Sequence, residues 1–314
     1  MHVLVTGGAG FIGSQVVAAL LARGDIVTVL DSFDDAYDPA LKRANLQGTA
    51  ARVVEGDLRD LETVEAALGD ADAVVHLAAR AGVRESLADP LLYESVNVRG
   101  TTVVLEALRR QGRARLVFAS SSSVYGARAD GARFTEDDNA DTPVSPYAAT
   151  KRAGELICHA AHAAWGIPVT CLRFFTVYGP RQRPAMAIAK FFELIRAGEP
   201  LPVFGDGSAI RDFTYVADAV SSVLAALDHP SGYQVLNVGS DAPVRLDALI
   251  EAIARAAGAP ATLEHLPLQN GDVPRTHADV RRAREVLGWQ PTVSLDEGLR
   301  RYAAWVDAGR PRQA

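Results

Sequence analysis

The amino-terminal half of the chain alternates short apolar runs with segments of helical periodicity, and this alternation restricts the fold more than any other feature. The apolar runs contain consecutive β-branched and apolar residues, as expected of strands that are covered on both faces. We expect these strands at residues 2–7, 25–31, 51–57, 72–79, 114–121 and 169–175. The helices between them are expected at 14–24, 61–69 and 97–112. Strands that alternate with helices of this length form βαβ units, so the sequence predicts an α/β fold with a doubly wound parallel sheet.

The alternation stops near residue 175, and the rest of the chain predicts a different organisation. Loops rich in glycine, proline and arginine suit a module that faces a substrate. Residues 233–239 predict one more strand, which we expect to return to the main sheet, and a helix is expected near 295–309. The predicted division is a first domain at 1–175 with a returning segment at about 213–240, and a smaller mixed domain at 176–212 and 241–314.

The composition is that of a soluble globular protein, with 314 residues of which 48% are hydrophobic and 22% charged. A net charge of −6 gives no electrostatic reason to expect nucleic acid or an anionic membrane surface as a partner. No apolar run approaches the roughly 20 residues that span a bilayer, and no signal peptide is expected. Cys158 and Cys171 have neither a disulfide framework nor metal-type spacing. We therefore expect reduced core thiols, no metal site and a cytoplasmic location.

A glycine-rich segment, TGGAGFIG at residues 6–13, follows the first expected strand directly and opens the first expected helix. In this context the pattern G-x-G-x-x-G predicts a Rossmann-like site for a dinucleotide. A side chain at Gly7, Gly10 or Gly13 would block the tight turn, the approach of a pyrophosphate, or the packing of the helix on the strand. The start of the helix also offers free N–H groups and a partial positive charge to the phosphates.

Asp31 ends the second expected strand, close to the spacing from the glycines at which an acid holds the adenosine ribose hydroxyls. Its charge would repel a 2′-phosphate, and Ser32 rather than an arginine follows it, so NAD is favoured over NADP. Asp57 and Leu58, at the end of the third expected strand, are candidates to frame the adenine. Asp57 has an alternative role as the cap of the helix that follows.

The segment SPYAATK, residues 145–151, places Tyr147 and Lys151 on one face of an expected helix. Such a pair alone decides nothing, because it occurs by chance in many soluble helices. The serines at 120–123, however, end the fifth expected strand and should lie at the carboxyl edge of the sheet. Ligands bind at that edge in doubly wound folds, so a dinucleotide there would give the tyrosine and lysine a chemical role.

These motifs together resemble the extended short-chain dehydrogenase/reductase family, the NAD-dependent sugar-nucleotide epimerases and dehydratases. The resemblance extends over essentially the whole chain and includes TGGAGFIG, Asp31, GDL at 56–58, HLAA at 76–79, Asn97, SSSSVYG at 120–126, the Tyr-Lys pair and RDFTYV at 211–216. It implies NAD as the cofactor and a nucleotide sugar as the substrate. The expected cofactor contacts are Gly7, Gly10, Phe11, Ile12, Gly13, Asp31, Ser32, Asp57, Leu58, Leu77, Ala78, Ala79, Tyr147, Lys151 and Phe174.

In that family the tyrosine is the acid and base, which would make Tyr147 the central catalytic residue. A free tyrosine has a pKa of about 10. The resemblance implies that two positive charges lower it, the ammonium of Lys151 and the oxidised nicotinamide ring. Lys151 is also expected to hold the nicotinamide ribose. The serine or threonine of the family corresponds to Ser121, which would hydrogen-bond the reacting oxygen, with Ser122 as the alternative.

The two residues after the catalytic serine indicate which reaction follows hydride transfer. The 4,6-dehydratases of the family carry Asp-Glu there, and the uronate decarboxylases tend to carry a Glu. This chain has Ser122 and Ser123, which cannot act as such acids. We therefore expect a 4-epimerase, in which a 4-keto sugar turns over and takes the hydride back on its other face.

The identity of the sugar depends on residues 37–46 and 173–188, which resemble segments of UDP-glucuronate 4-epimerases. The resemblance implies that Thr176 and Arg183 face the C6 carboxylate, and an arginine fork matches a carboxylate in two parallel hydrogen bonds. Ala185 departs from the family pattern, which usually has an acid there. This departure keeps a neutral hexose, as in UDP-glucose 4-epimerases, as the alternative substrate.

The role of Arg183 and the catalytic nature of the protein each have a competing interpretation. Arg183 could instead be a solvated charge on a surface loop. A non-catalytic NAD-binding regulator on the same fold is a further hypothesis, but a pure sensor has no need of Tyr147, Lys151 and Ser121.

The nucleotide part of the substrate is expected to contact several segments. By resemblance, Arg211 binds the diphosphate and Asp272 binds the uridine ribose. Val203 and Phe204 would flank the base, while Arg84 would either point at the phosphates or sugar or form a surface ion pair. The expected substrate contacts are, in full, Arg84, Ser122, Ser123, Thr176, Arg183, Val203, Phe204, Arg211 and Asp272.

Two further residues are expected to be structural, and the resemblance also predicts an assembly. His76 lies in a strand and is expected to be a satisfied core histidine, and Asn97 is expected to tie the loop after the fourth strand to the cofactor region. Family members commonly dimerise through two helices, here those near 97–112 and 147–165, so we expect a homodimer.

Overall fold

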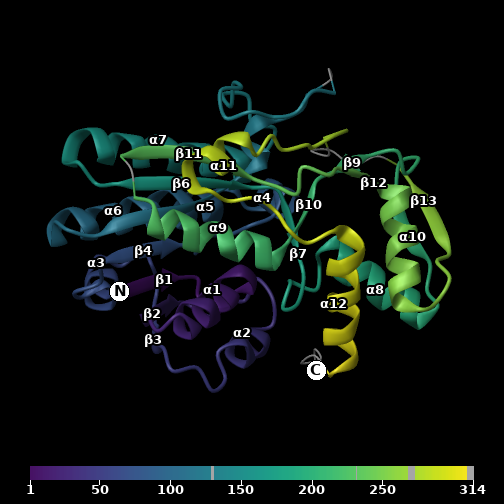
Figure 1. Cartoon of the computed structure of the whole chain (residues 1–314), viewed down its shortest axis with the longest axis horizontal. Helices are drawn as coiled ribbons and strands as arrows, with labels where there is room; N and C mark the ends of the chain where they lie inside the picture. The colour runs from purple at the N-terminus through teal and green to yellow at the C-terminus, as the bar shows by residue number, and fades with distance from the viewer. Residues whose placement is uncertain (129–130, 231, 268–272, 310–314) are drawn as a thin grey trace.

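The computed structural model describes residues 1–128, 131–230, 232–267 and 273–309. Its centre is a sheet of seven parallel strands in the order β11-β6-β5-β4-β1-β2-β3 (Figure 1). The strands are β1 (His2–Thr6), β2 (Ile26–Asp31), β3 (Arg52–Glu55), β4 (Ala73–His76), β5 (Arg115–Ser121), β6 (Val169–Phe174) and β11 (Tyr233–Val238). This sheet confirms the predicted doubly wound fold, and β11 returns to it beside β6 as expected.

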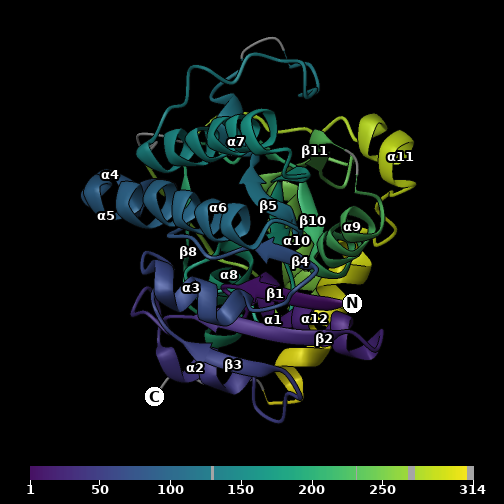
Figure 2. The ribbon, with the colours of Figure 1, turned by 90° about the vertical axis from the view of Figure 1, so that its left-hand side faces the viewer.

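Helices cover both faces of the sheet. They include α1 (Phe11–Ala22), α3 (Leu61–Leu68), α6 (Gly100–Gln111), α7 (Pro146–Trp165) and α9 (Val216–Asp228). Successive side chains of β1 point to opposite faces, so Val3 and Val5 pack in the cluster with α1 and α9. Leu4 packs in a second cluster with α3, α6 and α7, which lie in a row in Figure 2. The sheet is therefore buried on both sides, in agreement with its continuous apolar strands.

Two helices begin differently from the prediction. α1 begins at Phe11, three residues earlier than expected, so Gly13 lies inside the helix rather than before it. The helix expected at 97–112 is divided into a π-helical turn η1 (Glu94–Arg99) and α6. Gly112 ends α6 in the left-handed conformation with a φ of 82°, as expected of a glycine at this position.

The residues after β6 add three two-stranded sheets, which gather with several helices at one end of the main sheet (Figure 1). The pairs are β7 (Thr176–Tyr178) with β10 (Phe213–Tyr215), β9 (Ile210–Arg211) with β12 (Val244–Arg245), and β8 (Leu201–Phe204) with β13 (Leu263–Leu266). The helices at this end are α8 (Ala187–Ala197), α10 (Leu246–Ala257) and α12 (Leu295–Asp307), whereas α11 (Arg281–Leu287) lies beside β11 of the main sheet. The amino terminus of β1 lies at the other end, so the carboxyl ends of the strands face this part.

Cys158 and Cys171 are both buried and free, as expected of core thiols. Among the helices of the described ranges, none is long and apolar enough to cross a membrane.

Candidate active site

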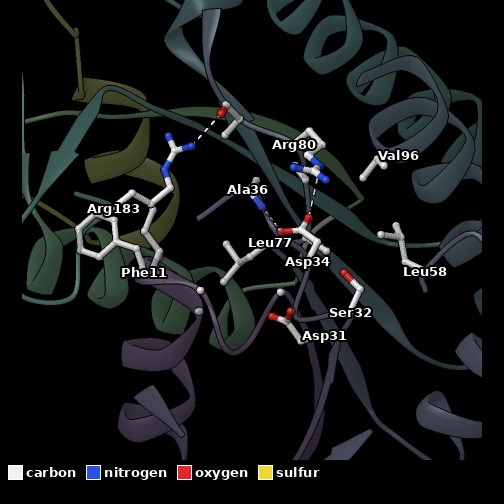
Figure 3. A pocket seen from close by; sticks show the side chains of 18 of the residues that line it. Phe11, Asp31, Ser32, Asp34, Ala36, Leu58, Leu77, Arg80, Val96 and Arg183 are labelled. Carbon is white, nitrogen blue, oxygen red and sulfur yellow. Dashed lines mark hydrogen bonds and ion pairs between the residues drawn. The ribbon is translucent and has the colours of Figure 1, made fainter. Parts of the chain in front are cut away.

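A cavity of about 400 Å³ opens at the carboxyl edge of the main sheet, within the size range of small-molecule sites (Figure 3). Every residue that the sequence predicted as a cofactor contact lines this cavity. The lining runs from the glycine turn after β1, past Asp31 and Asp57, to Tyr147 and Lys151 on α7. Residues far apart in the sequence meet here because the ends of adjacent parallel strands share one edge.

Two positions of the glycine turn, Gly7 and Gly13, have no room for a side chain. Gly7 has a φ of 69°, and a Cβ there would lie 2.7 Å from the backbone nitrogen of Ala78. A Cβ on Gly13 would lie 2.1 Å from the carbonyl oxygen of Gly7. Glycine therefore lets the first turn of α1 approach the end of β1, which leaves its free N–H groups at the cavity. This cradle fits the pyrophosphate of a dinucleotide.

Asp31 connects the glycine turn to the end of β2. Its Oδ2 accepts a hydrogen bond from the backbone N–H of Ala9 at 3.0 Å, and its Oδ1 accepts one from Phe33 at 2.9 Å. Burial raises the pKa of Asp31, and these two donors together with the charge of Lys42 oppose the rise. Each oxygen keeps a free lone pair, so the carboxylate can also hold ribose hydroxyls.

Asp57 does not cap the helix that follows, so that alternative is wrong. Asp60 is the N-cap of α3 and accepts a hydrogen bond from the backbone N–H of Glu62 at 3.2 Å. The carboxylate of Asp57 instead accepts from Nε of Arg59 at 3.0 Å. Asp57 and Leu58 both line the cavity, where the sequence predicts the adenine.

The catalytic candidates on α7 are positioned by the start of that helix. Ser145 is the N-cap and accepts a hydrogen bond from the backbone N–H of Ala148 at 3.2 Å, while Pro146 occupies the first helical position. Tyr147 therefore lies in the first turn and Lys151 one turn later on the same side. Both line the cavity.

Tyr147 lies close enough to Ser121, at the end of β5, for this serine to lower the pKa of the phenol. Ser121 Oγ also accepts a hydrogen bond from the hydroxyl of Ser123 at 2.9 Å. Ser121 lines the cavity, whereas Ser122 and Ser123 lie in the 3₁₀ turn η2 (Ser122–Tyr125), outside its described lining. The geometry therefore favours Ser121 over Ser122 as the partner of Tyr147.

Burial dominates the pKa of Tyr147 in the protein without a cofactor. It raises this pKa, and Ser121 and the charge of Arg183 reduce the rise without reversing it. The ammonium of Lys151 donates to the carbonyl oxygen of Ala119 at 2.8 Å. Burial lowers the pKa of Lys151 to about 8, against the opposing charge of Glu155. The protein alone therefore leaves the pKa of Tyr147 raised, and the predicted lowering by the nicotinamide ring of bound NAD stays a prediction.

A buried ion pair between Glu155 and Arg173 connects the helix that carries Tyr147 and Lys151 to the central sheet. Glu155, fully buried one turn after Lys151, accepts hydrogen bonds from Nε and Nη2 of Arg173, both at 2.8 Å. It also accepts one from the hydroxyl of Ser120 at 2.5 Å. Burial would raise the pKa of Glu155, but these donors outweigh it and lower the pKa. The pair joins α7, β5 and β6 at the level of Ser121.

Arg183 enters the cavity wall from the loop after β7. Its Nη1 donates to the carbonyl oxygen of Ala81 at 2.7 Å, as the dashed line in Figure 3 shows. Its charge acts on the pKa of both Tyr147 and Tyr37, which places the guanidinium within electrostatic reach of the two phenols. This position argues against the alternative that Arg183 is a solvated charge on a surface loop.

The remaining substrate candidates lie around the cavity. Among those that the structure describes, Arg183 is the only one in the lining. The guanidinium carbon of Arg84, on α4 (Val83–Ala88), lies 4.9 Å from the centre of the Phe204 ring, so these two candidates meet each other. The side chain of Val203 is 1% exposed and packs in the core, so a contact of this residue with the base would have to come from its backbone, and the expectation stays a prediction.

Two candidates lie in the short strands, and one is not described. Thr176 begins β7, and its backbone N–H donates to the carbonyl oxygen of Asp212 at 3.2 Å. Arg211 ends β9 and donates through Nη1 to the carbonyl oxygen of Ile210 at 2.9 Å. Asp272 lies outside the described residues.

Several lining residues were not predicted as contacts, among them Asp34, Tyr37, Lys42, Arg80 and Met186. The hydroxyl of Tyr37 is buried and has no hydrogen-bond partner among the described residues, and Lys42 Nζ lies 4.8 Å from the centre of its ring. The sequence contained one feature that indicates the position of Lys42. Asp38 and Pro39 are typical of a helix start, and they begin α2 (Pro39–Asn45), which brings Lys42 to the cavity.

The two residues expected to be structural have that role. His76 is 1% exposed, with Nδ1 at 2.6 Å from the Thr6 hydroxyl, and burial lowers its pKa to about 3, so it is neutral. Asn97 exchanges hydrogen bonds of 2.8 and 2.9 Å with the backbone of Arg80. Its Nδ2 also donates to the hydroxyl of Thr150 on α7 at 3.0 Å. Both predictions are confirmed.

The fold and the cavity together define a dinucleotide-dependent enzyme of the doubly wound class with a Tyr-Lys-Ser group at the cofactor. The family model described as the NAD dependent epimerase/dehydratase family matches residues 3–239. The chain belongs to this family, which confirms the predicted family and NAD as its cofactor.

Several proteins that are similar to this chain in sequence or structure are named as UDP-sugar 4-epimerases. A UDP-glucuronate 4-epimerase of Thermodesulfobacterium geofontis is 39% identical over 97% of this chain and 95% of its own length. The crystal structure of a UDP-glucuronic acid 4-epimerase from Bacillus cereus, in complex with UDP-glucuronic acid and NAD, is similar with a TM-score of 0.92 and 35% identity, over 98% of this chain and 99% of that one. A Thermus thermophilus UDP-glucose 4-epimerase in complex with NAD is similar with a TM-score of 0.91 and 36% identity, over 98% and 100% of the two chains.

Proposed function

We propose that the protein is an NAD-dependent UDP-sugar 4-epimerase that interconverts UDP-glucuronate and UDP-galacturonate. One observation carries this proposal: Tyr147 and Ser121 share a single cavity with the glycine cradle and with Arg183. The cradle fits the cofactor, the phenol fits a sugar hydroxyl, and the guanidinium fits a carboxylate on the same sugar. The likeness to relatives named for this reaction supports the same conclusion.

In the first half-reaction, Tyr147 as phenolate takes the proton from the C4 hydroxyl of the sugar while the C4 hydride departs. Bound NAD supplies the acceptor for this hydride and returns it in the second half-reaction. Ser121 donates a hydrogen bond to the reacting O4, and Lys151 holds the nicotinamide ribose. The sugar is then a 4-ketone. The ketone then rotates so that its other face receives the hydride. Tyr147 gives the proton back to O4, so the atoms and electrons balance over the cycle.

Tyr147 needs a further positive charge nearby to lose its proton, and we expect the bound cofactor to supply it. Burial raises the pKa of this phenol, and Lys151 donates to a backbone carbonyl instead of to the phenol. The charge of Arg183 reduces this rise without reversing it, and the positive nicotinamide ring of bound NAD would add a further charge that favours the phenolate. We infer that Tyr147 becomes an effective base only when NAD is bound, which ties proton transfer to the presence of the hydride acceptor.

The residues after Ser121 support epimerisation over elimination. Ser122 and Ser123 occupy the positions where a dehydratase would need acids, and neither hydroxyl can replace a carboxylic acid in removing water. The ketone therefore has one productive fate at this site, which is to take the hydride back.

Incubation with UDP-glucuronate and, separately, with UDP-glucose, followed by separation of the C4 epimers, tests the proposal. We expect UDP-galacturonate to form from the first substrate with a much higher kcat/KM than UDP-galactose from the second. Preference for the neutral sugar would replace the proposed substrate by the hexose alternative. Stoichiometric and lasting change of cofactor absorbance would instead identify a net oxidoreductase.

We also propose the assembly, the location and the domain division. A homodimer through α6 and α7 is supported by Leu156 and Trp165 on α7, whose side chains are 54% and 50% exposed. Light scattering of the purified chain measures this state, and a monomeric mass would contradict it.

Two buried free thiols are consistent with a cytoplasmic location. Residues 176–212 and 241–314 are proposed to hold the nucleotide half of the substrate.

A further inference from the structure

An ion pair joins the loop after β4 to the loop after β2. Nε of Arg80 lies 3.3 Å from Oδ2 of Asp34, and both residues line the cavity. Nη2 of Arg80 also donates to Oδ1 of Asp35 at 3.2 Å. Figure 3 shows Arg80 and Asp34 facing each other above Ser32 and Asp31.

This ion pair spans the position of the glycine turn. In the sheet, β1 lies between β4 and β2, and the glycine turn follows β1. A contact between the loops after β4 and β2 therefore passes over the carboxyl end of β1, where the pyrophosphate of a dinucleotide binds in this fold. We propose that Arg80 and Asp34 form a clasp that closes over the bound dinucleotide and slows its release. This inference rests on the NAD dependence of the proposed function.

The Asp34 end of the clasp is held in place. Lys42, which is buried, pairs with the carboxylate of Asp34 and donates to its backbone carbonyl oxygen at 2.8 Å. The backbone N–H of Ala36 donates to Oδ1 of Asp34 at 3.2 Å. Burial pushes the pKa of Asp34 upward, but the hydrogen bond and charge of Lys42 and the charge of Arg80 outweigh it. Asp34 is therefore ionised and oriented toward Arg80.

The Arg80 end of the clasp is held through its backbone. Asn97 accepts from the N–H of Arg80 and donates to its carbonyl oxygen, and it also donates to Thr150 on α7. Thr150 lies between Tyr147 and Lys151 in the sequence. The clasp thus links the adenosine side of the cavity to the helix that carries the catalytic candidates.

The two acidic partners of Arg80 differ in exposure, which separates the clasp from an ordinary surface contact. The side chains of Arg80 and Asp34 are 18% and 30% exposed, whereas that of Asp35 is 91% exposed. A pair that is shielded from water keeps more of its attraction than an exposed one. We therefore assign the clasp to Asp34, whose contact with Nε of Arg80 is an ion pair without hydrogen-bond geometry, and Asp35, which accepts the hydrogen bond of Nη2, provides a matched control.

The proposed reaction gives such a clasp a purpose. The hydride must return to the sugar from which it came, because loss of the cofactor between the half-reactions would leave an oxidised sugar in the site. An epimerase consequently needs slow release of its dinucleotide, whereas a dehydrogenase that exchanges its cofactor at every turnover does not.

A competing interpretation makes the opposite prediction for one variant. If Arg80 binds the diphosphate directly, Asp34 competes for the guanidinium and weakens cofactor binding. Removing the charge of Asp34 would then strengthen binding and slow release. In the clasp, the same change opens the cavity and accelerates release.

The test follows radiolabelled NAD leaving the full-length protein after a chase with excess unlabelled NAD, in the absence of any sugar. Arg80→Gln and Asp34→Asn are each expected to release NAD about 10-fold faster, since loss of one partner of a shielded charge pair acts mainly on the dissociation rate. The double variant should release no faster than either single one, because both remove one shared interaction. Arg80→Lys, which keeps the charge, should lie nearer to the unchanged protein.

Asp35→Asn is the matched control and should change the release rate by less than about twofold. Thermal unfolding of each variant establishes that it is folded, and the conservative Arg80→Lys keeps the test usable if Arg80→Gln is not. Slower release from Asp34→Asn, or unchanged release from Arg80→Gln, would overturn the clasp. A protein that binds NAD but turns over no UDP-sugar would overturn the proposed function and still leave the clasp measurable.

Discussion

The cofactor half and the substrate half of the cavity are built in different ways. Every predicted cofactor residue lines the cavity, whereas among the described substrate candidates only Arg183 does. The cofactor residues follow the ends of neighbouring parallel strands, which meet at one edge whatever their separation in the sequence. The substrate candidates after residue 175 lie in loops and short strands, whose positions depend on pairing between distant segments. A motif therefore locates a contact well when regular structure fixes its surroundings.

Tyr147 belongs to both halves, and its replacement should have the largest effect. Tyr147→Phe keeps the ring but removes the group that exchanges the proton, so kcat should fall by about 10³-fold or more. Binding of NAD and of the UDP-sugar should stay nearly unchanged, which titration of each ligand measures. Epimerisation at a rate close to that of the unchanged protein would remove Tyr147 from the mechanism.

The cofactor half is tested by Gly13→Ala. The added Cβ would lie 2.1 Å from the carbonyl oxygen of Gly7, so the turn must open and affinity for NAD should fall by about 100-fold. Equilibrium binding of NAD measures this loss. Gly112→Ala is the control: no atom lies within 4 Å of its added Cβ, so it should lower thermal stability through backbone strain alone. Equal affinities in the two variants would contradict the cradle.

The substrate half is tested by Arg183→Ala. We expect kcat/KM for UDP-glucuronate to fall about 30-fold more than that for UDP-glucose, since only the uronate offers a carboxylate to the guanidinium. Arg84→Ala serves as the control, because Arg84 packs on Phe204 outside the lining and should affect both sugars alike. Equal losses for both sugars in Arg183→Ala would remove the carboxylate from the role of Arg183.

The smallest expected effect is a dependence on pH that originates in Lys151. Burial lowers the pKa of this ammonium to about 8, so it loses its proton as the pH rises through that value. Because the charge holds the nicotinamide ribose, kcat/KM should decline by up to about tenfold per pH unit above it. A profile of kcat/KM against pH measures the decline. Activity that stays constant to about pH 10 would show that Lys151 acts without its charge.

The sequence predicted the sheet, the cofactor edge and the meeting of Tyr147, Lys151 and Ser121 at one cavity, because each has a local signature. The strands β2 and β5 end at Asp31 and Ser121 as expected, β4 ends at His76, three residues before the expected end at 79, and the glycine pattern defines its own geometry. His76 and Asn97 also followed from simple reasoning, since a polar residue inside a buried strand or helix must find partners. The structure supplies those partners as the hydroxyls and the backbone groups described above.

The ion pair of Arg80 and Asp34 and the burial of individual site residues could not be predicted, because they depend on contacts between distant segments. Arg80 and Asp34 are ordinary charges in the sequence, and their pairing becomes visible only when β4 and β2 are placed on either side of β1. The pKa of Tyr147 was predicted from charges alone, whereas burial dominates in the structure. The burial of the Val203 side chain was likewise not predicted, because it depends on how β8 packs against the rest of the chain.

The buried pair of Glu155 and Arg173 has a consequence for how the sugar is inverted. The pair fixes β5, which carries Ser121, to α7, which carries Tyr147, so these two proposed catalytic side chains share one rigid support. We therefore expect the sugar, and not this support, to change its orientation when the 4-ketone presents its other face.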